Sequence, residues 1–293
     1  MRAVGCDILF DDIFRTESPI VLHSVFSHAA NMLCDDVVYA IVSREGYSAP
    51  ATAVVGGTCL FSHLAEHEGS YVARRGGSLL FETGDVIECG TCARSDTRLC
   101  SHEWNPDTVE RSVQAYDACT SEYTSRADTL AFYRARYASA SALPSDAPLP
   151  LANAFDSFME AMRTGEAFDD AVLHILGAGI GLTPSGDDFL CGALCTFAGT
   201  INSTAMELRE RLRRCLTEDR LVSRTTIVSA SMLENACGGM AASSYRTFVD
   251  AVLSRPDDVP ACFNTLFAVG ATSGVDFSVG VICAVRLLIE QGY

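Results

Sequence analysis

The spacing of apolar residues changes near residue 150, and this change most constrains the fold. Residues 19–100 contain short apolar or β-branched runs such as IVLHSVF and VVYAIVS, separated by Gly, Ser, Pro, Asn and Asp. This pattern is typical of strands joined by tight turns. After residue 151 the apolar residues follow a 3.6-residue period in long segments, which predicts helices. We therefore expect an α+β fold with a β-rich N-terminal domain and an all-helical C-terminal domain.

Two further segments refine this division. HAANMLCDD, residues 28–36, interrupts the strand pattern and suits one helix. Residues 106–140 are polar with helical spacing, and three prolines follow within residues 143–151. Because prolines are typical of linkers, we place the boundary there. Residues 1–145 then form the β-rich domain, and residues 146–293 form a helical domain that carries the two motifs described below.

The counts of acidic and basic residues exclude some classes of partner and some catalytic mechanisms. Thirty-seven acidic residues against 21 basic ones give a formal net charge of −16, and such a surface repels nucleic acid. All 21 basic residues are arginine, because the sequence contains no lysine. The chain therefore cannot supply a Schiff-base, P-loop or kinase-type lysine. Any anion clamp must use arginine, backbone N–H groups or a metal.

The N-terminus and the cysteines favour a cytoplasmic protein. MRAVGCDILFDDIF carries acids where a signal peptide has a basic start. The apolar stretch FSVGVICAVRLLI is shorter than a bilayer span and contains Arg286. Of the 13 cysteines, Cys191, Cys195 and Cys283 lie at helical spacing among apolar residues, where reduced cysteine packs as a small hydrophobe. We expect no membrane partner.

The helical half contains one motif twice. GIGLTPSGDDFLCG, residues 179–192, is echoed by GATSGVDFSVG, residues 270–280. When Pro184 is omitted, both copies read Gly, Thr, Ser-Gly, Asp-Phe and Gly in the same order. A repeat of this kind indicates two equivalent local structures.

Two interpretations of the copies stay open. In one, Ser185 with Asp188, and Ser273 with Asp276, form capping boxes at two helix starts. In the other, glycines and free N–H groups at each helix start bind a ligand. The capping interpretation does not explain Asp187. It also does not explain the threonine ahead of each serine, which is Thr183 in the first copy and Thr272 in the second. The acids would repel an anion unless a divalent metal bridged them or an amide or ureido substrate donated N–H groups to them.

A polar stripe lies between the copies. In RTTIVSASMLENACGG, residues 224–239, helical spacing places Thr225, Ser229 and Met232 on one face with Thr226 beside them. Hydroxyls in a buried helix often bond to the carbonyl one turn earlier. The stripe therefore fits either a structural role or a substrate contact.

Together, GIGLTPSGDDFLCG, TTIVSASMLENACGG and LFAVGATSGVDFSVG resemble the AllH-type family in their order and separation. The resemblance is specific over about residues 170–290 and weaker over residues 19–60. It implies a subunit of an oxamate carbamoyltransferase complex, found near FdrA-like proteins in purine and allantoin catabolism. The implied reaction converts oxalurate and phosphate to oxamate and carbamoyl phosphate, so the substrate is a small anionic or ureido molecule.

The motif positions supply the candidate site residues. The candidate catalytic residues are Asp187, Asp188, Asp276, Thr183 and Thr272. The candidate substrate-binding residues are Ser185, Gly186, Thr225, Thr226, Ser229, Ser273 and Gly274. Carbamoyl transfer needs an anion site, donors for a developing oxyanion and two oriented reactants, but no covalent nucleophile. These residues require no cofactor, and Mg²⁺ is compatible with the paired aspartates.

Other functions stay open. A non-catalytic ligand-binding or scaffold subunit could use the glycine motifs to shape a partner interface. A Mg²⁺-dependent phosphoryl-transfer enzyme would need a nucleotide site that the sequence does not show. Separately, four residues have partial zinc-ligand spacing, although the spacing is short of the usual finger lengths. These weak metal candidates are Cys89, Cys92, Cys100 and His102.

Overall fold

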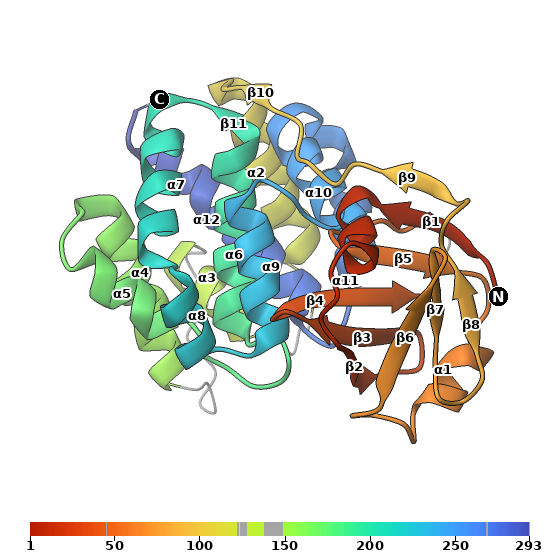
Figure 1. Ribbon diagram of the computed structural model, residues 1–293. Coiled ribbons are helices and arrows are strands. Elements are labelled where there is room, and N and C mark those ends of the chain that lie inside the picture. Colours follow the sequence, from red (N-terminus) through yellow and green to blue (C-terminus); the bar gives the residue numbers. More distant parts are fainter. Residues whose placement is uncertain (45, 122, 124–127, 138–148, 268, 293) are drawn as a thin grey trace. The chain divides into compact units, whose positions relative to one another are not determined.

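The computed structural model describes residues 1–44, 46–121, 123, 128–137, 149–267 and 269–292. Two compact units divide the chain, Met1–Arg98 and Leu99–Tyr293. Strands dominate the first unit and helices the second (Figure 1), which confirms the α+β prediction. The boundary predicted between residues 145 and 146 lies outside the described residues. The compact helical unit already begins at Leu99, because the helices that precede the proline-rich segment pack into its core.

A nine-stranded sheet forms the first unit, in the order β8-β7-β6-β2-β3-β4-β5-β1-β9. Its pairs are antiparallel except for β4–β5 and β1–β9. The helices of this unit are the 3-10 helix η1 (Ile8–Phe14) and α1 (Cys59–Leu64). The strands are β1 (Ala3–Asp7), β2 (Ile20–Val25), β3 (Ala29–Cys34), β4 (Val37–Val42), β5 (Thr52–Val55), β6 (Tyr71–Arg75), β7 (Ser78–Leu80), β8 (Val86–Glu88) and β9 (Ala93–Ser95).

The helix predicted for residues 28–36 is wrong, because these residues form β3 and the turn after it. Ala30, Met32 and Cys34 are buried, and the residues between them are half-buried. This alternation has a period of two, as in a strand with one face on a core. Asp35 and Asp36 then adopt positive φ angles of 50° and 61° and turn the chain into β4.

The second unit is helical except for one short parallel strand pair. Its helices agree with the helical segments predicted after residue 151, except that the predicted segments 151–176 and 222–237 each form two helices. The elements are β10 (His102–Glu103), α2 (Pro106–Thr120), α3 (Asp128–Tyr137), α4 (Leu149–Thr164), α5 (Phe168–Ile175), α6 (Ser185–Gly199), β11 (Thr200–Ile201), α7 (Ser203–Cys215), α8 (Glu218–Arg224), α9 (Ile227–Cys237), α10 (Ser243–Ser254), η2 (Pro256–Asp258), α11 (Val259–Phe267) and α12 (Ser273–Glu290).

Helices α6 and α12 pack along each other and are surrounded by the other helices of the unit (Figure 1). Each is buried over most of its length, as expected for helices that are apolar on all sides. None of the described helices combines the length and apolar character that a membrane crossing requires. The two copies of the motif therefore begin the two central helices of one unit.

Reciprocal glycines set the close approach of α6 and α12. A Cβ atom on Gly192 would lie 2.1 Å from the carbonyl oxygen of Phe277, and one on Gly280 would lie 2.0 Å from that of Phe189. Phe189 and Phe277 hold equivalent places in the two motif copies, as do the two glycines. The repeat therefore also serves helix packing, because the backbone of each helix packs against a glycine of the other helix.

Candidate functional site

The two motif serines are the first residues of their helices and do not cap them. The residues at the cap positions are Pro184 for α6 and Thr272 for α12, and neither makes a side-chain cap hydrogen bond. The half-buried Ser185 and the half-buried Thr272 therefore have no capping role. The capping-box interpretation of both copies is wrong, because each serine lies one position too late to accept the N–H bonds of a cap.

The two copies converge in space. Thr183 Oγ1 lies 2.9 Å from Ser273 Oγ and forms a hydrogen bond with it, although 90 residues separate them in the chain. Both side chains are half-buried, so this hydroxyl pair lies between the inside of the helical unit and its surface. The loops ahead of α6 and α12 therefore meet at one place.

Two aspartates lie beneath this place, at equivalent positions four residues into their helices. Asp188 on α6 and Asp276 on α12 are both 0% exposed. Neither carboxylate oxygen of Asp188 accepts a hydrogen bond within the part of the chain that the structure describes. Asp276 Oδ1 accepts one from Thr129 Oγ1 on α3. A buried carboxyl without hydrogen bonds costs free energy, so packing alone does not explain Asp188.

Burial raises the pKa of Asp188 well above its ordinary value, and the charge of Asp276 raises it further. The Ser273 and Thr183 hydroxyls lie close enough to lower this pKa, but their hydrogen bond joins them to each other rather than to the carboxylate. Asp187 adds a smaller repulsion. The net effect is that Asp188 ionises less readily than a free aspartate, as expected for a buried carboxyl near another acid.

Asp187 has a different environment, although it is also 0% exposed. Its Oδ1 accepts the N–H of Gly177 at 2.7 Å, and its Oδ2 accepts the hydroxyl of Thr225. Burial raises the pKa of Asp187, and the Thr225, Gly177 and Ser229 groups oppose that rise. Asp187 therefore holds the glycine-rich loop and the segment between α8 and α9 against α6, which is a structural role.

We expect Asp187→Ala to lower the free energy of unfolding by about 2–3 kcal/mol, because the buried N–H of Gly177 and the Thr225 hydroxyl would lose their acceptor. Urea unfolding followed by circular dichroism measures the change. Asp257→Ala is the matched control, since the Asp257 side chain is 90% exposed and should change stability by less than about 0.5 kcal/mol. Equal stability of the two variants would contradict the structural role.

The polar stripe of the third segment also contacts this loop. Thr226 caps α9 by accepting the N–H of Ser229 at 3.1 Å, and its hydroxyl donates to the carbonyl oxygen of Leu182. Ser229 is buried, and its Oγ has no hydrogen-bond partner within the described ranges. The candidates Thr225 and Thr226 thus position the loop, whereas the Ser229 hydroxyl lies near enough to Asp187 to lower its pKa without meeting the distance and angle of a hydrogen bond.

The glycines at the helix starts have a packing explanation. A Cβ atom on Gly186 would lie 2.0 Å from the carbonyl oxygen of Ile175, and one on Gly274 would lie 1.9 Å from that of Leu266. Their N–H groups donate to the carbonyl oxygens of Ala178 and Val269, at 2.8 and 3.2 Å. These amides are therefore engaged inside the chain and are not free for an anion.

The three segments that converge here can be compared with known families. Residues 175–285 match the family model described as oxamate carbamoyltransferase subunit AllH. The match includes α6, α9 and α12 as far as residue 285, with their preceding loops, and it confirms the resemblance to the AllH family. No solved structure matches the chain.

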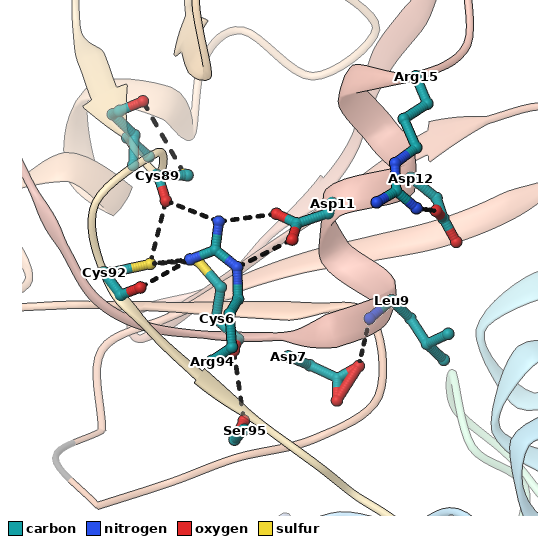
Figure 2. A network of polar contacts seen from close by, with 11 residues as sticks. Cys6, Asp7, Leu9, Asp11, Asp12, Arg15, Cys89, Cys92, Arg94 and Ser95 are labelled. Carbon is teal, nitrogen blue, oxygen red and sulfur yellow. Dashed lines mark hydrogen bonds and ion pairs between the residues drawn. The ribbon is translucent and has the colours of Figure 1, made fainter.

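The metal candidates lie outside the residues that match AllH, and the structure gives three of them other contacts. Figure 2 shows Arg94 held by Asp11 through two bonds of 2.8 and 2.9 Å. The same guanidinium donates to Cys92 Sγ at 2.9 Å and to the carbonyl oxygen of Cys89 at 3.1 Å. Cys92 Sγ in turn lies 2.9 Å from Cys6 Sγ.

Of the other two metal candidates, Cys100 is exposed, and His102 Nε2 lies 2.9 Å from Asp250 Oδ1. All 13 cysteines are free. Across the ranges that the structure describes, no group of three or more His, Cys, Asp and Glu side chains is arranged to hold a metal ion. Zinc at the cysteines and Mg²⁺ at the paired aspartates therefore gain no support from the geometry.

Sequence reasoning missed two residues of α3, a helix that packs against both α6 and α12. Thr129 donates to Asp276, and the Nε and Nη2 atoms of Arg134 are buried without a hydrogen-bond partner among the described residues. Neither residue belongs to a motif, and α3 lies outside the segment that matches AllH. Only the tertiary structure brings Thr129 to the site.

Proposed function

We propose that the two motif copies form one substrate site of an oxamate carbamoyltransferase subunit, which converts oxalurate and phosphate to oxamate and carbamoyl phosphate. The observation that carries this proposal is the hydrogen bond between Thr183 and Ser273 above the unpartnered Asp188 carboxyl. The family described for residues 175–285 is a subunit of oxamate carbamoyltransferase. We also propose that this reaction belongs to purine or allantoin catabolism.

The residues of this site suit a ureido group. The hydroxyls of Thr183 and Ser273 can donate to the carbamoyl oxygen, where negative charge develops during transfer. A carboxyl group such as Asp188 can accept the N–H groups of the substrate or donate a proton to it, depending on its protonation. Thr272 and Ser185 are half-buried and lie close in sequence to Ser273 and Thr183, respectively. In this proposal they are further substrate contacts.

The anionic parts of the reactants need a positive partner, because the amides of Gly186 and Gly274 are engaged. Arg134 on α3 is the candidate, since its Nε and Nη2 atoms are buried without a hydrogen-bond partner among the described residues, which is costly unless they meet an anion. Its planar donors suit a carboxylate or a phosphate. We assign Arg134 to the anion and the hydroxyl pair to the carbamoyl group.

A second candidate function is favoured by the complete burial of both aspartates. A scaffold subunit without catalysis could use the Asp188 and Asp276 pair only to join α6 to α12. In that case the chemistry would belong to partner subunits, for which FdrA-like proteins are our proposal. A subunit of such a complex needs partners in either case.

An assay with oxalurate and phosphate separates the two functions. Carbamoyl phosphate formation is measured for the chain alone and for the chain with its partner subunits, in each case as wild type and as Ser273→Ala. We expect the substitution to lower turnover in every active preparation, because one oxyanion donor is typically worth about 100-fold or more in rate. Unchanged turnover with Ser273→Ala in an active complex would favour the scaffold.

A further inference from the structure

We propose that Cys6 and Cys92 are an oxidative modification site, a thiol pair that hydrogen peroxide converts to a disulfide. Cys92, which is half-buried, is oxidised first, and the buried Cys6 then closes the bond. Both cysteines belong to the first unit and lie outside the residues that match AllH. This inference is independent of the proposed function.

The two sulfur atoms already touch. Cys92 Sγ lies 2.9 Å from Cys6 Sγ, although 86 residues separate them in the chain. Cys6 is on β1, and Cys92 directly precedes β9, the edge strand that pairs with β1 in parallel. A disulfide has an S–S distance of about 2 Å. The sulfurs therefore need to approach by only about 1 Å, which small side-chain rotations can supply while the strands stay paired.

Cys92 is the end of the pair that an oxidant can reach. It is half-buried between the exposed residues Thr91 and Ala93, whereas Cys6 is 1% exposed. Oxidation of a cysteine requires access for the oxidant. The first oxidation therefore falls on Cys92, and Cys6 is the thiol that resolves it.

The charges around Cys92 set the speed of this reaction. The groups that face its sulfur are Cys6, the Cys89 carbonyl oxygen at 3.2 Å and Arg94, whose Nη1 lies at 2.9 Å and whose guanidinium is held by Asp11 (Figure 2). Burial and the contact with Cys6 raise the pKa of Cys92 to about 11, and Arg94 opposes the rise. Because the thiolate is the reactive form, we expect slow oxidation that accelerates as pH rises from 7 to 9.

Cys89 is the rival partner for Cys6. Its thiol lies close enough to Cys6 to raise the pKa of that residue. Cys89 is, however, 0% exposed, so an oxidant does not reach it first. The position of the bond, on Cys92 or on Cys89, therefore distinguishes the proposed route from a random pairing.

The reaction consumes two thiols and one peroxide and forms two waters. The Cys92 thiolate attacks a peroxide oxygen, the O–O bond breaks, and the hydroxide released takes up the proton that Cys92 lost. The product is a sulfenic acid. The Cys6 sulfur then attacks the Cys92 sulfur, the S–O bond breaks, and the leaving hydroxide takes the Cys6 proton. Each sulfur loses one electron overall, and the peroxide accepts both.

Peptide mapping of the full chain, treated with hydrogen peroxide at pH 8, tests the pair. Remaining thiols are blocked under denaturing conditions before digestion with trypsin, which cuts after arginine in this lysine-free chain. Cys6 then lies in the peptide of residues 3–15, and Cys89 and Cys92 lie in that of residues 76–94. We expect these peptides to be joined, fragmentation to place the bond on Cys92, and dithiothreitol to separate them.

Two variants and a melting curve complete the test. Cys92→Ser should abolish the joined peptides, and Cys59→Ser, which changes an exposed thiol of the same unit, should keep them. The oxidised wild type should melt higher than the reduced form, because the bond closes a long loop of the unfolded chain. A bond on Cys89, no joined peptides, joined peptides in Cys92→Ser, or an oxidised form that melts no higher would each overturn the inference.

Discussion

Asp188→Asn is expected to lower carbamoyl transfer by at least about 100-fold while making the folded chain more stable at pH 8. Asparagine keeps the size of the side chain but can neither donate a carboxyl proton nor become a carboxylate. Loss of a general acid or base typically costs about 100- to 10,000-fold in rate. Carbamoyl phosphate formation by the assembled complex measures the loss of activity.

The stability change follows from the sign of the pKa shift. The pKa of Asp188 is raised in the folded chain, so its contribution to stability is complete below the ordinary carboxyl pKa and is lost as pH rises through the raised value. The neutral amide of the Asp188→Asn variant does not ionise and so carries no such loss. We expect the variant to be more stable than wild type by on the order of 1–3 kcal/mol at pH 8, with no difference near pH 4.

This opposition between activity and stability separates a functional acid from a structural one. Asp187→Ala should destabilise the chain, because Asp187 accepts two hydrogen bonds, whereas Asp188 accepts none among the described residues. If Asp188→Asn retained full activity, or if it were less stable than wild type at pH 8, the role assigned to Asp188 would be wrong.

Gly280→Ala is expected to destabilise the helical unit by about 3 kcal/mol or more. The new methyl group would lie 2.0 Å from the backbone carbonyl oxygen of Phe189, so α6 and α12 would have to separate along their contact. Helix propensity favours alanine over glycine by about 1 kcal/mol, which is too little to offset this clash. Thermal unfolding followed by the helical circular dichroism signal measures the effect.

Two matched variants test the packing explanation. Gly192→Ala should have a similar effect, because its methyl group would lie 2.1 Å from the Phe277 carbonyl oxygen. Gly56→Ala places a methyl group where no atom lies within 4 Å and should change the melting temperature little. A Gly280→Ala variant as stable as Gly56→Ala would contradict the close approach of the two helices.

The sequence was most informative where periodicity is long. The helices after residue 151 were predictable because their apolar residues repeat over several turns. The breaks that divide a predicted segment into two helices depend on the backbone conformation of a few residues. Gly165 and Ala167 have φ angles of 78° and 46° and separate α4 from α5. The short strand β3 was mistaken for a helix because its alternation of Ala30, Met32 and Cys34 does not run long enough to exclude one.

The motif repeat predicted that two loops belong together but not what each residue does. Gly186 and Gly274 face backbone carbonyl oxygens, and Thr225 holds Asp187, which only packing reveals. The difference between Asp187 and its neighbour Asp188 likewise depends on partners from distant segments. Thr129 could not have been found, since it reaches Asp276 across 147 residues without a motif of its own.

The central claim is that both motif copies bind one ligand, and a double-mutant cycle tests it most directly. Calorimetry gives the dissociation constant of oxalurate for the wild-type complex, for Thr183→Val, for Ser273→Ala and for the double variant. We predict that each single change weakens binding by about 5- to 50-fold and that the double change costs less than the sum of the two, because the hydroxyls act together. Binding that depends on only one hydroxyl, or that neither change affects, would contradict a shared site.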